Sequence, residues 1–485
     1  MILDNFSKLL TKIVRPLKTV ILLPFIFFAG CDEEAKPSDN LVENYSHWDG
    51  PWITFGQCDG STASININFI QGTKSSATIH FGETDPPSDS FTNPELSFFH
   101  TFRFDNLVSG QQYFYSVDFP EGTVTDSFIA PNCSNSIKFA VLGDMQPDSE
   151  TTLASAILMA EAIEFENPDF FIQLGDLVYR GTDADFWHDS LTALKISAGA
   201  VPLRAVCGNH DKQYDGGDNW RMMMPHDWNP AGLEKHCYYY TDTVSNVRFI
   251  FMDTTCEDNG PGSDQILWLE EVLSSNTSQW TFVFLHDSLL SSGMENIPWH
   301  NTSVLIPIFD RYGVDGVFYG HDHMYEHYEF TYGSNGFVFD PDHIWEHSPV
   351  HYWLTGGGGA ALESEWGIAR RDTFSYSRRL YEAATGLEVK RDYTTRPWNT
   401  DNFITDAPAD FSPSSPVYFH DPDVELYQDE SAFFGLDYGV NSLHYIMVEV
   451  AGDTCTVTVK YPDGTTVSAP ENRRIQTWTL TKSLK

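Results

Sequence analysis

The chain is short of basic residues. It has 28 Lys and Arg against 68 Asp and Glu in 485 residues, which gives a formal net charge of −40. Proteins that bind nucleic acid or anionic lipid surfaces use clusters of basic side chains, so this composition argues against both partners. Hydrophobic residues make up 41% of the chain and aromatic residues 14%, which argues against disorder. The sequence therefore predicts a strongly acidic globular protein of two or three domains.

The sequence also lacks a hydrophobic run of membrane-spanning length. The apolar segment Thr19–Gly30 falls well short of the roughly 20 residues that a spanning helix needs. Four basic residues precede it, which is typical of an export signal at residues 1–30. Its Phe-Ala-Gly-Cys ending resembles a bacterial lipobox and implies lipidation of Cys31. An ordinary secretory signal is the alternative. The lipobox implies a protein anchored in the bacterial cell envelope, on a periplasmic or outer-surface face of a membrane.

Cysteine is scarce as well, and no pair has the spacing of a structural zinc site. An even number remains once the candidate lipidated residue is set aside, which permits disulfides in an exported protein. Cys237 and Cys256 flank a predicted hairpin, so they could face one another. Cys58 and Cys133 bracket the N-terminal module and could close it. Cys207 lies in an apolar run and is predicted to be a buried free thiol.

The hydrophobic pattern changes along the chain. Residues 31–48 are polar and acidic and are predicted to be a linker, whereas alternating runs over 49–132 predict an all-β sandwich. In the domain predicted at 135–485, strands alternate with helices, which indicates an α/β fold. Residues 366–440 lack clear periodicity and are predicted to be an insertion. The predicted helices are Thr151–Glu166, Ala184–Ser197, Ser263–Leu273 and Val304–Tyr312.

Five short polar segments each follow a predicted strand. They are Gly143-Asp144, Gly175–Tyr179, Gly208–Asp211, Leu285-His286 and Gly320–His323. Open α/β sheets place their sites at the carboxyl ends of strands, so we expect these segments to converge. Their carboxylates, amide, phenol and imidazoles are metal ligands, and Asp176 is suited to bridge two cations because a carboxylate has two oxygens. The ordered set predicts a dinuclear metallohydrolase.

This ordered set resembles the calcineurin-like metallophosphoesterase superfamily. The tyrosine at position 179 and the run Gly-His-Asp-His-Met-Tyr-Glu from Gly320 resemble its purple-acid-phosphatase-like branch. The N-terminal module resembles the fibronectin-type domain of that branch at Gly50–Trp52 and Phe104–Tyr115. The resemblance implies a four-layer α-β-β-α metallophosphoesterase sandwich, preceded by an all-β fibronectin-type sandwich domain. It covers most of residues 50–360 and 442–465.

The resemblance also implies a ligand set and residue roles. One cation, usually Fe(III), would be held by Asp144, Asp176, Tyr179 and His323. The second, Zn, Mn or Fe(II), would be held by Asp176, Asn209, His286 and His321. A metal-bound hydroxide would then attack the phosphorus of a small phosphoester. His210 would bind the phosphate or protonate the leaving group. His300 would be a further substrate-facing residue, with a plain loop histidine as the alternative.

Two residues depart from the family pattern, and one basic segment lies outside the resemblance. At Gln146 acid phosphatases usually have glycine and other members a metal-binding histidine, so its amide could coordinate, bind a water or point away. Asp287 replaces a second histidine found in many relatives and adds negative charge near an anionic substrate. Residues 366–396 are basic, and they could form a lid that recruits phosphate or could make plain surface ion pairs. The candidate substrate contacts are therefore Gln146, Asp287, Arg370 and Arg371.

The glycine run Gly356–Gly359 lacks the Lys-Ser/Thr of a phosphate loop. We interpret it as a place where the backbone closely approaches the metal site. The sequence as a whole predicts an exported, lipid-anchored phosphomonoesterase of acid-phosphatase type. The alternatives are a phosphodiesterase or nucleotidase that uses the same metals, and a surface-binding lipoprotein without catalysis.

Overall fold

A computed structural model describes most of the chain after the predicted signal and linker. The described residues are 45–291, 299–330, 350–362, 417–419, 436–466 and 477–482, apart from 121, 135, 214, 215 and 257. They belong to one compact unit, Ser38–Lys485. The predicted signal peptide, Cys31, Arg370 and Arg371 lie outside the described residues. No helix in the described ranges has both the length and the hydropathy needed to cross a membrane.

Five strands occupy the region where alternation predicted β structure. They are β1 (Asp49–Asp59), β2 (Thr62–Gly82), β3 (Asp89–Val108), β4 (Gln112–Phe119) and β5 (Gly122–Ile129). Each pairs antiparallel with a neighbour, and the long strand β2 pairs with β1, β3 and β4. Their inward side chains, such as Ile67 and Phe69, form a hydrophobic cluster of their own. The sheet does not stop there, because β1 also pairs parallel with β8 through Thr54 and Leu203.

The first sheet of the α/β region continues from β1. Its strands are β8 (Leu203–Ala205), β7 (Phe170–Gln173), β6 (Ser136–Leu142), β17 (Tyr445–Ala451), β18 (Thr454–Lys460) and β19 (Thr477–Thr481). The pairs β6–β7 and β7–β8 are parallel, whereas β17 returns antiparallel beside β6. Two long helices connect the parallel strands, α2 (Glu150–Glu166) and α3 (Ala184–Ala198). The C-terminal strand β17 thus lies beside β6, which precedes it by roughly 300 positions in the sequence.

The second sheet has eight strands within the described ranges. In sheet order they are β15 (Val417–Phe419), β16 (Leu436–Asn441), β13 (Tyr325–Phe330), β14 (Val350–Thr355), β12 (Gly316–Tyr319), β11 (Trp280–Phe284), β10 (Val247–Phe251) and β9 (Tyr240–Val244). The four strands β14, β12, β11 and β10 run parallel. The helices after β10 and β11 are α6 (Asp264–Ser274) and α7 (Trp299–Tyr312), and two short helices precede β9, α4 (Asp218–Met223) and α5 (Pro230–Leu233).

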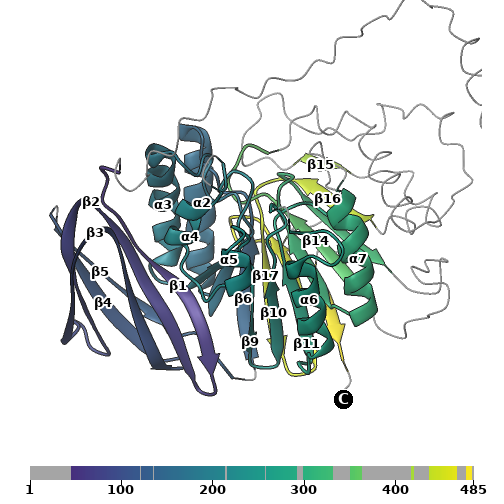
Figure 1. Ribbon diagram of the computed structural model, residues 1–485, viewed down its shortest axis with the longest axis horizontal. Helices are drawn as coiled ribbons and strands as arrows, with labels where there is room; N and C mark the ends of the chain where they lie inside the picture. The colour runs from purple at the N-terminus through teal and green to yellow at the C-terminus, as the bar shows by residue number, and fades with distance from the viewer. Residues whose placement is uncertain are drawn as a thin grey trace, which may run out of the picture. The chain divides into compact units, whose positions relative to one another are not determined.

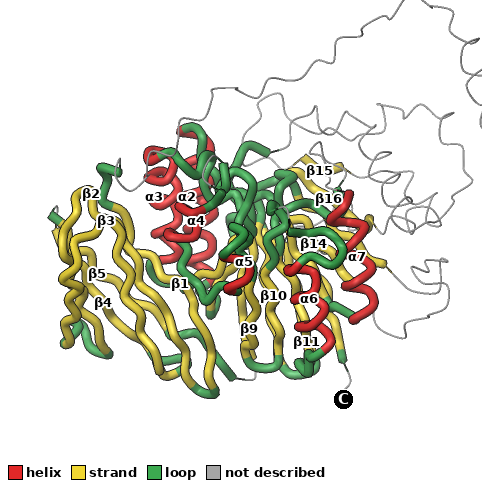
Figure 2. Tube along the Cα trace, viewed as in Figure 1, coloured by secondary structure: helices red, strands yellow, loops and turns green. Residues whose placement is uncertain are grey.

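Three hydrophobic clusters join the elements into four layers. One cluster packs α2 and α3 against the first sheet, and another packs α6 and α7 against the second. The cluster between the two sheets is rich in aromatic rings, with Phe139 beside Phe170 and Phe249. Figures 1 and 2 show the result, with helices outside two inner layers of strands. The order α-β-β-α agrees with the fold that the resemblance implied.

Several elements differ from the sequence prediction. Helix α2 begins one residue earlier than expected, behind the Ser149 cap, and α7 begins at Trp299 instead of Val304. Strands β13 and β19 were not predicted. Strands β15 and β16 lie within the segment that shows no periodicity in the sequence, and β16 pairs with β13. These strands have three to six residues each, which is too few to show a clear alternation in the sequence.

Both predicted disulfides are present. Cys58 and Cys133 close the N-terminal strands, and Cys237 and Cys256 join the two ends of the β9–β10 hairpin. Cys207 is a buried free thiol, as predicted.

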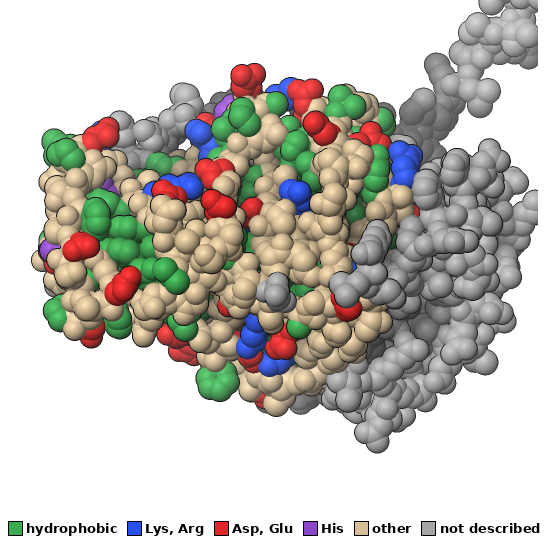
Figure 3. Space-filling view, turned by 90° about the horizontal axis from the view of Figure 1, so that it is seen from below, with side chains coloured by type: hydrophobic (Ala, Val, Ile, Leu, Met, Phe, Trp, Pro, Cys, Tyr) green, Lys and Arg blue, Asp and Glu red, His purple; other side chains and the backbone are tan. Residues whose placement is uncertain are grey.

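The surface over the N-terminal strands exposes several apolar side chains. Figure 3 shows hydrophobic groups gathered on that side, among scattered acidic and basic groups. The exposed large hydrophobic residues of β3 and β5 are Phe91, Leu96, Val108, Val124 and Ile129. Scattered exposed apolar residues are normal on soluble proteins, and nothing in the structure identifies a partner for these.

Replacing Phe139 by Ala tests the aromatic layer between the sheets. The ring is fully buried, so we expect the free energy of unfolding to fall by about 3–5 kcal/mol. Phe165→Ala is the matched control, because that ring is 83% exposed, and it should change stability by about 0.5 kcal/mol or less. Denaturant melts of both variants measure the difference, and equal midpoints would contradict a shared core between the sheets.

His444 gives a prediction for acid stability. It is fully buried beside Tyr325, and its Nδ1–H donates to the Ser442 carbonyl at 2.8 Å. Burial lowers the pKa of His444 to about 4. The unfolded chain binds a proton at His444 more readily than the folded chain does. The contribution of neutral His444 to folding stability is therefore complete above the usual histidine pKa and is lost as the pH falls towards 4. The metal-free protein should lose on the order of 2 kcal/mol between about pH 7 and pH 5 through this group.

Denaturant melts at the two pH values, for the wild type and His444→Gln, measure that loss. The variant should show a weaker fall in stability, whatever its stability at neutral pH. An equal fall in both proteins would show that His444 is not responsible.

Candidate metal centre

The candidate ligands lie in loops that follow the carboxyl ends of strands in both sheets. Asp144 follows β6, Asp176 follows β7, and His321 follows β12. All three have positive φ angles, of 60°, 52° and 77° respectively. Such angles are uncommon for residues other than glycine and cost free energy, so they persist where the surroundings impose them, often at functional sites. The backbone of these loops is therefore shaped around the side chains that it presents.

Asp176 is the centre of one group of ligands. Its carboxylate lies with the imidazoles of His286 and His321 in a group whose ligand atoms are all within 4.8 Å of one another. His286 Nε2 is 3.3 Å from Asp176 Oδ1 and 2.9 Å from Asn209 Oδ1. The other ring nitrogen of His286 donates to the Leu174 carbonyl at 2.8 Å, which leaves Nε2 to face the group.

Asp144 and His323 form a neighbouring group. His323 Nε2 is 3.8 Å from Asp144 Oδ1, and its Nδ1–H donates to the Ala361 carbonyl at 2.6 Å. The backbone N–H of His321 donates to both carboxylate oxygens of Asp144, at 3.1 Å each. Gln146 does not point away, since its amide nitrogen lies 3.0 Å from His323 Nε2.

Glycines make room for these carboxylates. A Cβ on Gly208 would lie 2.1 Å from Asp176 Oδ1, and one on Gly320 would lie 2.2 Å from Asp144 Oδ2. These separations are far below van der Waals contact, so any larger residue would displace the carboxylate. The glycine run Gly356–Gly359 closely approaches the site, as the sequence indicated. The N–H of Gly358 donates to the carbonyl of Gly143 at 2.9 Å, next to Asp144.

Buried charge makes this group suitable for cations. Asp144 and Asp176 are at most 1% exposed, and in the described part of the chain their ion pairs are with histidines. Burial, reinforced by the negative charge of Asp176, holds the pKa of Asp144 well above its usual value. For Asp176 burial acts in the same direction, but the charge and hydrogen bond of His286, together with the charges of His210 and His321, outweigh it and lower the pKa.

For His286 the neighbouring carboxylates outweigh burial and raise the pKa. Burial lowers its pKa, but the charge and hydrogen bond of Asp176, followed by the charge of Asp144, raise it well above the usual value. When no metal is bound, the negative charges of Asp176 and Asp144 thus favour a proton on this imidazole. Carboxylate, amide and imidazole donors buried together are those that zinc, iron and manganese bind, and a cation would replace that proton.

His210 and Tyr179 lie next to this centre. The N–H of His210 donates to Asp176 Oδ1 at 2.9 Å, and its Nδ1–H donates to the Tyr179 carbonyl at 2.7 Å. The Tyr179 ring packs against His210 and Phe186. Its hydroxyl makes no hydrogen bond within the described residues, so its role as a ligand stays a prediction.

The remaining predicted residues are placed less directly. Asp287 is buried, and its Oδ2 accepts from the amide of Asn301 at 3.0 Å. His300 is in the first turn of α7, but its side chain lies outside what the structure describes. Arg370 and Arg371 lie outside it entirely.

Asp211 is a supporting residue to which the sequence analysis gave no role. Its buried carboxylate accepts from the backbone N–H groups of Asp176, Leu177 and Val178 at 2.9, 3.0 and 3.2 Å, and from Gly208 at 2.8 Å. One side chain thus ties together the loops that follow β7 and β8. The only signal in the sequence is an aspartate directly after the histidine of the Gly-Asn-His segment.

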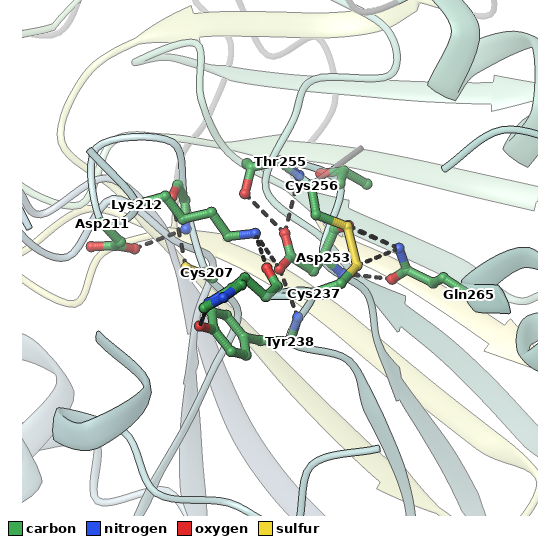
Figure 4. Close-up of polar contacts among 12 residues, drawn as sticks. Cys207, Asp211, Lys212, Cys237, Tyr238, Asp253, Thr255, Cys256 and Gln265 are labelled. Carbon is green, nitrogen blue, oxygen red and sulfur yellow. Dashed lines mark hydrogen bonds and ion pairs between the residues drawn. A yellow bond between two sulfur atoms is a disulfide. The ribbon is translucent and has the colours of Figure 1, made fainter. Parts of the chain in front are cut away.

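Lys212 extends this support towards the second sheet. Its ammonium group donates to Asp253 Oδ2 at 2.6 Å, and both side chains are largely buried. Asp253 also accepts from the N–H of Tyr238 at 2.7 Å and from the hydroxyl of Thr255 at 2.8 Å. Figure 4 shows this network between Asp211 on one side and the Cys237–Cys256 disulfide on the other. A buried ion pair with both partners hydrogen-bonded fixes the loop rigidly, because breaking it leaves an uncompensated charge.

Comparison with known proteins finds a family match over the part of the chain that holds this site. Residues 137–325 match the family model for calcineurin-like phosphoesterases. A probable purple acid phosphatase 20 of Arabidopsis thaliana is 24% identical over 306 residues, which is 54% of this chain and 66% of the relative. The chain spans about half to two thirds of the length of such purple acid phosphatase relatives.

Solved structures agree on the fold. A purple acid phosphatase from yellow lupin seeds superposes with a TM-score of 0.57 at 14% identity. The superposition covers 90% of this chain and 74% of the lupin chain. A structure of PhoD superposes with a TM-score of 0.55 at 10% identity, over 86% of this chain and 92% of its own. Residues 137–325 thus match the calcineurin-like phosphoesterase family, and the fold of the chain is of the purple-acid-phosphatase type.

Proposed function

We propose that this protein is a dinuclear metal-dependent phosphohydrolase that acts on small phosphomonoesters. The observation that carries the proposal is the convergence of Asp176, His286 and His321, from three separate loops, into one buried group of ligand atoms. Buried charges are costly unless they are paired or coordinate a metal, and no lysine or arginine among the described residues forms an ion pair with Asp176. The match to the phosphoesterase family supports the reaction class.

The proposed ligands divide into two overlapping sets. The first, for Fe(III), is Asp144, Asp176, Tyr179 and His323. The second, for Zn, Mn or Fe(II), is Asp176, Asn209, His286 and His321. Two cations held there would activate a water molecule and neutralise the charge that develops on the phosphoryl oxygens. The short distances from His286 Nε2 to Asp176 and Asn209 support the second set most directly.

We assign proton transfer to His210. Its Nδ1–H is committed to the Tyr179 carbonyl, and its backbone N–H is committed to Asp176. These two bonds fix the ring beside the carboxylate and leave Nε2 for the substrate. A protonated Nε2 can bind the phosphate and pass its proton to the departing alkoxide.

We propose that the segments outside the metal centre anchor the protein or recruit substrate and take no part in the chemical step. We propose that the protein is exported and anchored by lipid on Cys31, and this rests on the signal and lipobox pattern of the sequence alone. The proposal also keeps a fibronectin-type module for β1–β5, which is supported by five antiparallel strands around their own hydrophobic cluster. The candidate phosphate-recruiting residues Arg370 and Arg371 remain part of the proposal on sequence grounds.

The role of His210 can be tested by replacing it with Gln. We expect kcat on p-nitrophenyl phosphate to fall by about 10²–10⁴-fold, because the group that transfers the proton is lost. Metal content should stay unchanged, since His210 is not one of the proposed ligands. His80→Gln, in the N-terminal strand β2, is the control and should keep full activity.

The same assay with the bis-p-nitrophenyl ester separates the alternatives. A faster rate on the diester would favour a phosphodiesterase. A wild-type protein that carries two metals but cleaves neither ester, nor a broad panel of nucleotides, would contradict the proposed activity.

The lipid anchor predicts a second outcome. Expressed in bacteria, the full chain should incorporate labelled palmitate and sediment with membranes, and Cys31→Ser should do neither. Cys207→Ser is the control, because this thiol is buried. Release of the wild type in soluble, unlabelled form would contradict the anchor without bearing on the metal centre.

A further inference from the structure

Gln146 has an unusual environment at the edge of the metal centre. Its side chain is only 4% exposed, and its backbone N–H donates to the Asp176 carbonyl at 3.1 Å. Its amide nitrogen is 3.0 Å from His323 Nε2. Its amide oxygen is buried and has no hydrogen-bond partner within the described residues. An unsatisfied buried polar atom costs about 1–3 kcal/mol, so this oxygen calls for a partner.

The contact with His323 limits what that partner can be. His323 carries its proton on Nδ1, where the Ala361 carbonyl accepts it, so Nε2 presents a lone pair towards Gln146. In one orientation of the amide, its NH₂ group donates to this lone pair and the oxygen has no partner within the described residues. The amide oxygen and nitrogen are nearly indistinguishable in shape, and the reversed orientation places the oxygen opposite Nε2. Two acceptors 3.0 Å apart repel one another unless a cation lies within reach of both.

We propose that the Gln146 side-chain oxygen is a metal ligand that shares one cation with His323 and Asp144. The assignment rests on the proposed metal centre and adds a ligand to the first of its two sets. In this orientation the oxygen has the cation as its partner, and the His323 lone pair is free to bind the same metal instead of accepting from the NH₂ group. A carboxamide adds no charge, so the cation keeps more of its power to polarise the substrate than it would beside another carboxylate.

The two amide orientations predict opposite effects of Gln146→Met. Methionine has a similar volume but lacks both the amide oxygen and the NH₂ group. If the oxygen is a ligand, the variant should bind the metal shared with His323 at least 10–100-fold more weakly, the range found for groups that merely support ligands. If the NH₂ group fills the His323 lone pair, its removal frees a ligand, and metal affinity should stay equal or rise.

The experiment measures Co²⁺ binding to the full chain by competition with a chromophoric chelator. The visible spectrum of bound Co²⁺ reports the ligands directly and needs no activity. We expect Gln146→Met to lose affinity at one of two sites and to change the spectrum, whereas Gln146→Glu, which keeps an oxygen there, should retain both sites. Gln71→Met is the matched control, because Gln71 is buried in β2 away from these loops, and it should bind like the wild type.

Two results would overturn the assignment, and they are distinguishable from one another. Equal or tighter binding by Gln146→Met, with an unchanged spectrum, would remove Gln146 from the ligands while leaving the metal centre intact. A wild-type protein that binds no Co²⁺ would overturn the metal centre itself, and the Gln146 assignment with it. Circular dichroism of the metal-free variants checks that each is folded, and Gln146→Glu provides an independent comparison if the methionine variant does not fold.

Discussion

Two carboxylates, Asp144 and Asp176, are buried side by side in loops from neighbouring strands, and histidines are their only charged partners among the described residues. Such an arrangement is unstable unless positive charge enters it, because a buried anion in a medium of low polarity must be neutralised. In the metal-free chain the two carboxylates raise the pKa of His286, which favours a positive charge on its ring. Metal ions supply it better, and the rest of the architecture keeps the two carboxylates where they can be used.

The support is mostly backbone geometry. Left-handed conformations at the ligands, glycines where a Cβ would collide with a carboxylate, and four N–H groups gathered by Asp211 hold the loops in one shape. The Lys212–Asp253 ion pair connects this shape to the β9–β10 hairpin and its disulfide. The two sheets meet through a core of packed aromatic rings, so loops from both are fixed relative to one another. A rigid scaffold of this kind positions ligands from distant parts of the sequence with little reorganisation when a cation binds.

Much of this could be predicted from the sequence, for identifiable reasons. Buried parallel strands such as β6 and β12 are short apolar runs that end in a polar ligand, and this pattern places the site directly. Both disulfides are among the pairings that the cysteine positions around the strands permitted. Strands β15 and β16 could not be predicted, because they have only three and six residues and lie in a segment without periodicity. The supporting role of Asp211 was also missed, since its partners are backbone groups that leave no mark on neighbouring residue types. The position of Gln146 against His323 could only come from the structure, because the two are 177 positions apart.

Anomalous X-ray diffraction from crystals of the metal-loaded protein would test the central claim most directly. The account predicts two cation peaks on either side of the Asp176 carboxylate, one beside His286 and one beside His323. A single peak elsewhere would contradict it. So would an empty site in which the two carboxylates are neutralised by protons alone.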